Sequence, residues 1–273
     1  MNNAVLVVIG AGGIGQAIAR RQGAGKTLLL ADVNEQTLAS AAKDLQSAGY
    51  IVTTQRVDVS SRESVKALAD AAADSGSVVQ VVHTAGVSPN QAPAKTILAV
   101  DLLGTALVLE EFGRVIASGG AGIVISSMAG YMPAPLPHEQ EQALAWTPAD
   151  ELLQLPFLGD DAVPNSGAAY GLSKRANHLR VQAASVIWGD RGARLNSISP
   201  GIILTPLAEH EMASAAGPRY QRMIEISAAK RVGTTDEIAA AAAYLLGPEA
   251  GFITGSDLLI DGGVIAAMRA KRL

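Results

Sequence analysis

The chain has no cysteine among its 273 residues, which excludes disulfides and thiolate metal sites. Charged residues are also scarce: they make up 17% of the sequence, against about 25% in typical globular proteins, while hydrophobic residues make up 49%. This balance excludes an intrinsically disordered chain and favours a globular protein with a large core. Aromatic residues contribute only 4%, so that core has to be built from Ala, Val, Ile and Leu.

Further absences exclude classes of partner. There is no long run of Lys or Arg and the net charge is −4, so we expect no nucleic-acid partner. The longest apolar helical run, residues 238–246, is about half of the ~20 residues that a membrane span requires, so we expect no membrane partner. The apolar segment 4–18 follows no Lys or Arg and contains glycines, which is atypical of a signal peptide. We therefore expect a cytoplasmic protein.

Short apolar runs rich in β-branched residues alternate with helical patterns, as is typical of strands buried on both faces of a parallel sheet. The strands predicted in this way are residues 5–9, 28–31, 51–57, 78–82, 122–126, 195–198 and 257–260. Two capping boxes, Ser60 with Glu63 and Thr234 with Glu237, predict the starts of two helices. The alternation predicts an α/β fold with a doubly wound parallel sheet of about seven strands, a three-layer Rossmann fold, in one domain over residues 1–273.

Residues 131–166 interrupt this alternation and are predicted to form an insertion. The segment holds six of the twelve prolines, six carboxylates and no Lys or Arg, so it carries −6 and the rest of the chain +2. We consider two interpretations: a lid or wall for a hydrophobic substrate, or a segment that packs on its own domain or on another subunit. We expect residues 202–228 to form a second substrate loop. The apolar side chains of the insertion are Tyr131, Met132, Leu136, Trp146, Leu152, Leu155 and Phe157.

A glycine motif follows the first predicted strand. Gly10, Gly12 and Gly15 satisfy G-x-G-x-x-G, which lets the backbone approach a pyrophosphate at a helix N-terminus. Asp32 ends the second strand, where a carboxylate can accept hydrogen bonds from a ribose and repels a 2′-phosphate. Because no Lys or Arg lies in the glycine loop or directly after Asp32, the pattern favours NAD over NADP. The alternative is that Asp32 is a helix cap or turn residue.

A second pattern places an acid–base pair on one helix. Tyr170 and Lys174 are four residues apart, so on a helix their side chains share one face. A free phenol titrates near 10, and a neighbouring cation lowers its pKa. The pair follows Ser126 and Ser127, which end the fifth strand, at the edge where open α/β sheets collect their active sites.

From Val5 to Gly263 the sequence resembles the short-chain dehydrogenase/reductase family. Ser127 matches the family serine, and Tyr170 and Lys174 match its acid–base pair. The segments 196–201 and 261–263 resemble the family's Asn-x-x-x-Pro-Gly and C-terminal signatures. The resemblance implies NAD binding by Gly10, Gly12, Gly13, Ile14, Gly15, Asp32, Asp58, Val59, Ala85, Gly86, Tyr170, Lys174, Pro200, Gly201 and Thr205. It also implies a homodimer or homotetramer.

The sequence departs from the family pattern at three places. The glycine loop is one residue shorter, and we expect pyrophosphate binding to survive. His83 stands where the family has Asn, and we expect it to be a structural hydrogen-bonding residue. Asp101 replaces the Asn that holds a water of the family's proton relay, so we count it as a fourth catalytic residue. Its charge is expected to raise the pKa of Lys174 and to leave the relay altered but present.

The resemblance implies hydride transfer between a nicotinamide and a secondary alcohol or ketone, with Tyr170 exchanging the proton and Ser127 bonding the substrate oxygen. No group of His, Asp and Glu has metal-ligand spacing, so we expect no metal. His178 lies two turns beyond Tyr170, which we interpret as a coincidence of helix face. Two alternatives stay open: a nucleotide-binding regulator with little or no catalysis, and a lyase or epimerase that uses NAD on the same fold.

Overall fold

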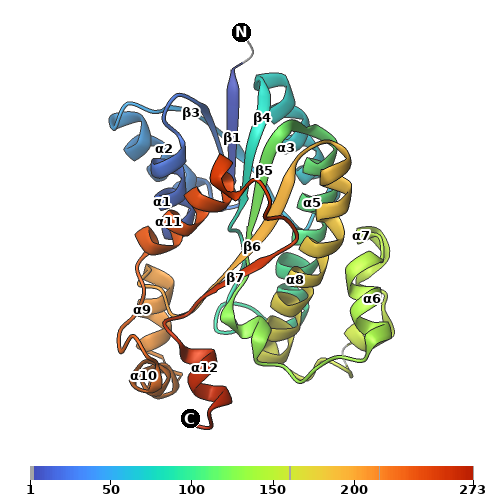
Figure 1. Cartoon of the computed structure of the whole chain (residues 1–273), viewed down its shortest axis with the longest axis vertical. Coiled ribbons are helices and arrows are strands. Elements are labelled where there is room, and N and C mark those ends of the chain that lie inside the picture. Colours follow the sequence, from blue (N-terminus) through green and yellow to red (C-terminus); the bar gives the residue numbers. More distant parts are fainter. Residues whose placement is uncertain (1–2, 160, 215, 273) are drawn as a thin grey trace.

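A computed structural model describes residues 3–159, 161–214 and 216–272. Asp160 and Ala215, which fall in the predicted insertion and substrate loop, lie outside the described residues, as do residues 1, 2 and 273. Seven parallel strands form one sheet in the order β3-β2-β1-β4-β5-β6-β7, which confirms the predicted fold (Figure 1). The strands are β1 (Ala4–Ile9), β2 (Thr27–Asp32), β3 (Ile51–Arg56), β4 (Ser77–His83), β5 (Ile116–Ile125), β6 (Arg194–Pro200) and β7 (Asp257–Ile260).

Helices cover both faces of the sheet and give the three predicted layers (Figure 1). One face carries α1 (Gly13–Gln22), α2 (Glu35–Ser47) and α11 (Thr235–Leu246), and the other carries α3 (Arg62–Ser75), α5 (Gly104–Val115) and α8 (Ser166–Asp190). Each layer buries its own apolar cluster against the sheet. This is why the central strands are apolar on both sides: residues 5–9 of β1 are all fully buried.

The two predicted capping boxes have different outcomes. Thr234 and Glu237 form the reciprocal capping box at the start of α11, as predicted. The prediction at Ser60 is wrong, because Ser61 caps α3 by accepting a hydrogen bond from the backbone of Ser64. The Ser60 hydroxyl is instead 2.6 Å from the carboxylate of Asp58, to which it donates, so it is not available as a cap.

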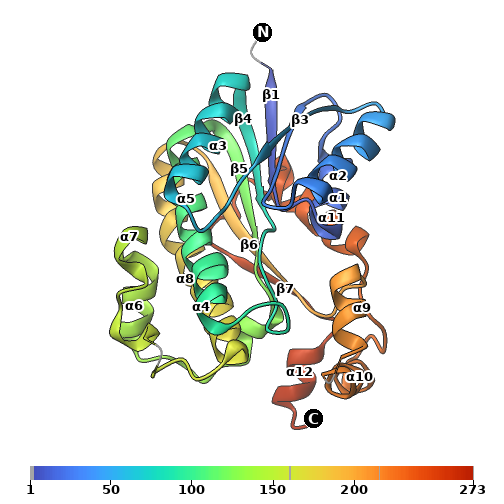
Figure 2. The same cartoon turned by 180° about the vertical axis from the view of Figure 1, so that it is seen from behind.

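The predicted insertion forms α6 (His138–Trp146), α7 (Ala149–Leu152) and a 3₁₀ turn, Pro156–Leu158. Both helices lie beside the layer of α5 and α8, outside the sheet (Figures 1 and 2). Leu144 and Leu152 are fully buried there, and Arg180 of α8 donates to the carbonyls of Leu144 and Thr147 at 3.1 and 2.7 Å. Residues 138–158 therefore pack on the α5–α8 layer of their own domain.

The other apolar side chains listed for the insertion lie in different surroundings. Tyr131 and Met132 pack against the apolar cluster of Met128, Ile202 and Met223 near the C-terminal end of the sheet, whereas Trp146 is exposed. Part of the acidic charge is paired: Glu141 is 2.5 Å from Arg175, and Asp150 is 2.7 Å from Arg62. Leu136, Leu155 and Phe157 are half-buried against the α5–α8 layer.

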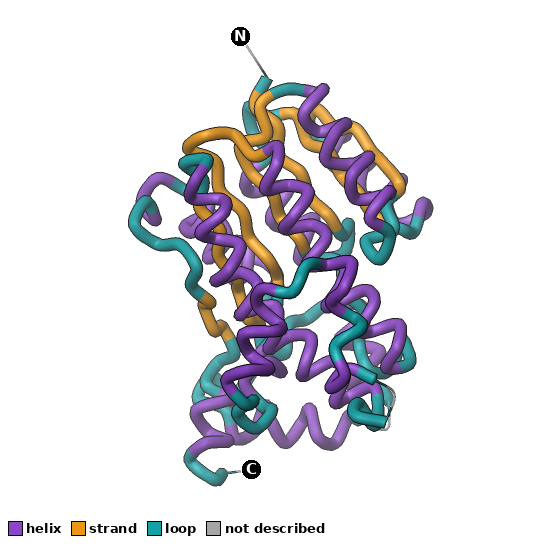
Figure 3. Tube along the Cα trace, turned by 90° about the vertical axis from the view of Figure 1, so that its right-hand side faces the viewer, coloured by secondary structure: helices purple, strands orange, loops and turns teal. Residues whose placement is uncertain are grey.

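The carboxyl ends of the strands face a group of helices and loops (Figure 3). This group includes α9 (Pro206–Met212), α10 (Gly217–Ile226) and α12 (Val264–Arg269), near the C-terminus (Figure 1). Between β4 and β5, the helix α4 (Ala94–Ile97) continues through a π-helical turn, Leu98–Leu103, into α5. Among the described residues no helix is long and apolar enough to cross a bilayer.

Candidate active site

The glycine loop leaves an open approach to the N-terminus of α1. Gly10 has a φ of +100°, and a side chain there would collide with Thr84. Gly15 packs against the carbonyl of Gly10 and has no room for a side chain either. Gly12, in contrast, has no atom within 4 Å of where a Cβ would lie. Since the first N–H groups of a helix have no partner within the helix, the loop fits a pyrophosphate despite its missing residue.

Asp32 has the role of a turn residue, one of the two considered for it. One carboxylate oxygen accepts from the amide of Ala11 at 2.8 Å, and the other accepts from Asn34 at 2.9 Å, so Asp32 is a turn residue that holds the glycine loop. Asn34, not Asp32, caps α2. The carboxylate is still partly exposed and can accept a ribose hydroxyl. In β3 the exposed Arg56 is the register partner of Asp32, a neighbouring cation that the sequence pattern did not predict.

The other predicted cofactor residues line the same end of the sheet. One oxygen of Asp58 accepts from the amide and hydroxyl of Ser60, and Val59 is buried against Gly104. Thr205 caps α9, and its methyl group lies near Gly13. The remaining predicted residues lie close by. Ala85 and Gly86 follow β4, Pro200 ends β6 and Gly201 follows it, and Ile14 packs its side chain in the α1 layer.

Ser127, Tyr170 and Lys174 come together although 43 residues or more separate Ser127 from the other two in the sequence. Ser127 follows β5, and its hydroxyl accepts from the amide of Ala129 at 3.1 Å. Tyr170 and Lys174 lie on one face of α8, with the ammonium 5.3 Å from the centre of the phenol ring. The hydroxyl of Ser127 lies near the phenol of Tyr170 and acts to lower its pKa. Such a trio can hold a substrate oxygen and exchange a proton with it.

The pKa of Tyr170 is raised, which differs from the lowering expected from its lysine. Burial has the largest effect and raises it, and the negative charges of Asp101 and Glu211 add to this. Lys174 lowers the pKa of Tyr170, as expected from the sequence, and the nearby Ser127 hydroxyl acts in the same direction, but together they do not outweigh burial. The phenol is therefore a proton donor at neutral pH.

Asp101 pairs with Lys174 inside the protein. Its carboxylate is fully buried on the π-helical turn, 3.1 Å from the ammonium, and its other oxygen accepts from the amide of Val87 at 2.8 Å. Burial lowers the pKa of Lys174, but the charges of Asp101 and Tyr170 raise it and prevail, in the direction expected from the sequence. Gly86 lies directly beside this ion pair, since a Cβ there would be 3.3 Å from both groups.

The comparisons with known proteins agree with this geometry. A family profile described as short chain dehydrogenase matches residues 3–137, and one described as enoyl-(acyl carrier protein) reductase matches residues 139–265. The short-chain dehydrogenase/reductase bsc3 of Alternaria brassicicola is 46% identical over 97% of both chains. The chain belongs to the short-chain dehydrogenase/reductase family. It is therefore an oxidoreductase of a family that uses nicotinamide cofactors.

One further relative and one solved structure are also similar to this chain. D-threitol dehydrogenase of Mycolicibacterium smegmatis is 31% identical, over 94% of this chain and 91% of that relative. A solved short-chain type dehydrogenase/reductase from Mycobacterium ulcerans has a TM-score of 0.76 at 24% identity. It covers 97% of this chain and 90% of its own, and shows that the two share the fold.

His83, the last residue of β4, is buried and neutral. Its Nε2 is 3.2 Å from the hydroxyl of Thr105. That hydroxyl donates its hydrogen to the carbonyl of Asp101, so Nε2 has to carry the imidazole hydrogen. Within the described residues Nδ1 has no partner. Burial, and then the charge of Lys174, lower the pKa of His83 to about 3.

Replacing His83→Asn is expected to make folding less sensitive to acid. The unfolded histidine binds a proton below pH 6.5 and the folded one only near pH 3, so protonation stabilises the unfolded state over that interval. The wild type should therefore lose about 2 kcal/mol more of its free energy of unfolding between pH 7 and pH 5 than the variant. Urea unfolding at both pH values measures this, and parallel losses would contradict the buried neutral state.

His178 belongs to a buried cluster of its own, apart from Tyr170. Its Nε2 is 2.8 Å from the hydroxyl of Ser199, and its ring contacts that of Tyr131 at a tilt of 49°, with 5.0 Å between centroids. Asp257 accepts from Tyr131 at 2.6 Å and from Ser199 at 2.9 Å. The cluster ties β6, β7 and α8 to the turn that follows Ser127, and none of its groups reaches the phenol of Tyr170.

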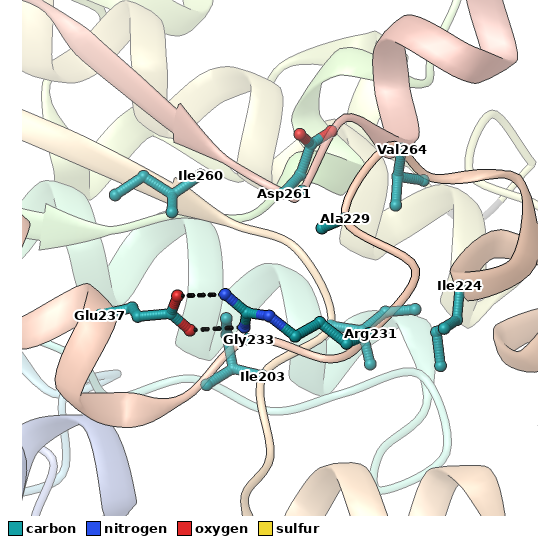
Figure 4. Close-up of a pocket in the computed structure, with 11 residues that line it drawn as sticks. Ile203, Ile224, Ala229, Arg231, Gly233, Glu237, Ile260, Asp261 and Val264 are labelled. Atoms are coloured by element: carbon teal, nitrogen blue, oxygen red, sulfur yellow. Dashed lines mark hydrogen bonds and ion pairs between the residues drawn. The ribbon is translucent and has the colours of Figure 1, made fainter.

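A separate cavity lies between α10, α12 and the ends of β6 and β7. It has a volume of about 150 Å³ and mostly apolar walls, with Arg231 and Glu237 paired at 2.6 Å on one side (Figure 4). Ser127, Tyr170 and Lys174 do not line it, so it is not part of the candidate active site. In the described part of the chain, no group of three or more His, Cys, Asp or Glu could hold a metal ion.

Proposed function

We propose that this protein is an NAD(H)-dependent oxidoreductase that interconverts a secondary alcohol and a ketone. The observation that carries the proposal is the convergence of Ser127, Tyr170 and Lys174 at the same sheet edge as the open N-terminus of α1. The partly exposed carboxylate of Asp32 supports NAD over NADP, because it disfavours a 2′-phosphate.

Each residue has a defined part in the proposed reaction. A nicotinamide cofactor, held at the glycine loop and by Asp32, would supply the hydride acceptor or donor for the substrate carbon. In ketone reduction, Tyr170 gives its phenol proton to the substrate oxygen while Ser127 donates a hydrogen bond to the same oxygen. Lys174 stabilises the resulting phenolate, and Asp101 keeps that buried lysine charged. In alcohol oxidation the phenolate takes the hydroxyl proton.

We also propose a substrate with an apolar body. The support is the cluster of Met128, Ile202 and Met223, which packs next to Ser127 and includes the half-buried Tyr131. A homodimer or homotetramer belongs to the same proposal. Two exposed aromatic side chains could contact a second copy: Tyr244, which lies in α11, and Phe252, which follows that helix.

Assays of secondary alcohols and ketones with NAD(H) and NADP(H) test the proposal. We expect turnover with both directions of hydride transfer and a preference for NAD over NADP. The Asp32→Asn variant removes the charge that repels a 2′-phosphate, so this preference should fall by about tenfold, equivalent to about 1.4 kcal/mol. Asp74→Asn, at an exposed position of α3, is the matched control and should leave it unchanged.

Three outcomes of these assays would contradict parts of the proposal. Cofactor binding without turnover of any alcohol or ketone favours the nucleotide-binding regulator. Conversion of a substrate without net production of reduced cofactor favours the lyase or epimerase. If the ratio of activity with NAD to activity with NADP is the same in the wild type and in Asp32→Asn, Asp32 does not select NAD.

A further inference from the structure

The turn that follows Ser127 holds the hydroxyl of that serine. Residues Met128–Tyr131 form one 3₁₀ turn, with Ser127 as its N-cap. The amide of Ala129 donates to the Ser127 hydroxyl oxygen at 3.1 Å, and the amide of Gly130 donates to the Ser127 carbonyl at 3.0 Å. The hydroxyl oxygen is the acceptor in the first contact, so its hydrogen can be donated to a substrate oxygen. The direction of this hydroxyl therefore depends on where the turn lies.

The same turn packs on α8 beside Tyr170 and Lys174. A side-chain carbon at Gly130 would lie only 2.9 Å from the carbonyl of Lys174, so the backbones of the turn and the helix are in close contact. Gly171, which follows Tyr170, is close to the turn as well, since a side-chain carbon there would be 3.6 Å from the carbonyl of Ala129. These contacts place the 128–131 turn directly at the candidate active site.

Tyr131 anchors the far end of the turn. Its phenol donates to Asp257, the first residue of β7, at 2.6 Å. The carboxylate of Asp257 also accepts from the hydroxyls of Ser197 and, at 2.9 Å, Ser199. Because Ser199 donates to Asp257, its oxygen can accept from Nε2 of His178, 2.8 Å away. The anchor of Tyr131 is therefore itself fixed by β6 and α8.

The bond between Tyr131 and Asp257 is shielded from water and persists at neutral pH and above. Tyr131 is half-buried, and the side chain of Asp257 is 9% exposed. Burial, followed by the bond to Asp257, raises the pKa of the Tyr131 phenol, so the phenol remains a donor. Its hydrogen is given to Asp257 and not to a substrate, so the hydroxyl can act on the site only through the turn.

We propose that Tyr131 is a positioning residue for Ser127: its hydrogen bond to Asp257 holds the 128–131 turn where the Ser127 hydroxyl faces the substrate oxygen. The inference rests on the proposed function, in which Ser127 bonds that oxygen. A displacement of about 1 Å at a reacting group can cost about 10²-fold in rate, so one hydrogen bond at the end of this turn can control turnover. The ring of Tyr131 has a separate part, since it packs in the apolar cluster with Met128.

Tyr131→Phe removes the hydroxyl and keeps the ring, so it tests the anchor alone. We expect kcat to fall by about tenfold and KM to stay within about threefold, because Ser127 bonds the substrate oxygen most strongly in the transition state. Tyr50→Phe is the matched control. The phenol of Tyr50 donates to the carbonyl of Arg20, also at 2.6 Å, beside β3 at the opposite edge of the sheet. This control loses a hydrogen bond of the same length and should keep the wild-type kcat.

A double-mutant cycle with Ser127→Ala separates positioning from a general structural effect. Ser127→Ala should lower kcat by about 10²- to 10³-fold, as does the loss of a donor to a reacting oxygen. If Tyr131 acts through Ser127, adding Tyr131→Phe to Ser127→Ala should change kcat by less than about twofold. A further loss of about tenfold in that background would show another route of action and overturn the inference. A loss in KM alone, or no loss, in Tyr131→Phe would also overturn it.

Amide hydrogen exchange tests the anchor without turnover. The amides of Ala129, Gly130 and Met132 are hydrogen-bonded within the turn. In Tyr131→Phe they should exchange about tenfold faster than in the wild type, whereas Tyr50→Phe should leave their rates unchanged. If the wild type turns over no alcohol or ketone, the proposed function fails, and these rates alone decide whether Tyr131 holds the turn. Equal rates in Tyr131→Phe and the wild type would overturn the inference in either case.

Discussion

Tyr170→Phe is expected to lower kcat by about 10²- to 10⁴-fold, the range that a positioned acid–base group contributes. The phenol can give its proton to the substrate oxygen, and the neighbouring Ser127 can donate a hydrogen bond to the same oxygen. Because its pKa is raised by burial, it stays protonated at neutral pH and serves as the acid in ketone reduction. Phenylalanine removes the proton and retains the ring.

The rest of the site should survive that substitution. The ring of residue 170 still fills its place on α8, and the ammonium of Lys174 still lies 5.3 Å from the ring centre. The dissociation constant of NADH, measured by fluorescence titration, should therefore stay within about twofold to threefold of the wild type. Tyr244→Phe, at an exposed position of α11, controls for loss of a tyrosine hydroxyl. Near-normal turnover in Tyr170→Phe would refute the assignment.

The raised pKa of Tyr170 also determines how the two directions depend on pH. Alcohol oxidation needs the phenolate, so its rate should rise as the pH increases toward the phenol pKa. Ketone reduction needs the protonated phenol and should keep its rate through neutral pH. A bound cofactor with a positively charged nicotinamide would lower this pKa, so the oxidative profile reports the value in the complex.

Local sequence signals predicted the parts of the molecule that depend on near neighbours. The wholly apolar run at 5–9 had to be a strand covered on both faces, because only a buried parallel sheet accommodates it. Thr234 and Glu237 fixed a helix start because their hydrogen bonds close within three residues. Ser127 and Tyr170 could be placed together because the carboxyl ends of parallel strands share one edge.

Other features depend on contacts that sequence spacing does not encode. Ser60 lost its predicted capping role to a hydrogen bond with Asp58, and neighbouring Ser61 serves equally well as a cap. The docking of α6 on α8 and the bond between Tyr131 and Asp257, 126 residues apart, require the folded chain. Glu211 could not be distinguished from Glu209 in the sequence, because only the loop conformation buries one and exposes the other.

Asp101→Ala is expected to lower the free energy of unfolding by about 3–5 kcal/mol, the cost of leaving one member of a buried ion pair without its partner. The ammonium of Lys174 is 3.1 Å from the carboxylate and 5% exposed as a residue, so water cannot replace the lost charge fully. The amide of Val87 loses its acceptor as well. Urea unfolding measures the loss.

Asp101→Asn restores the residue that the family has here and should be intermediate. A carboxylate offers acceptors to both Lys174 and Val87, whereas an amide has one oxygen and must turn its NH₂ toward one of these two donors. We therefore expect a loss of about 1–3 kcal/mol, the cost of one unsatisfied buried group. Asp74→Asn, on the exposed side of α3, should lose almost none.

The same variant tests whether Asp101 acts on the reaction through its charge. Asp101 raises the pKa of both Lys174 and Tyr170, so removing its charge should lower both values. The acidic limb of the alcohol-oxidation profile should then move to lower pH, because the phenolate forms more readily. If Asp101→Asn changes stability but leaves kcat and its pH profile as in the wild type, Asp101 is a structural partner of Lys174 and has no part in proton transfer.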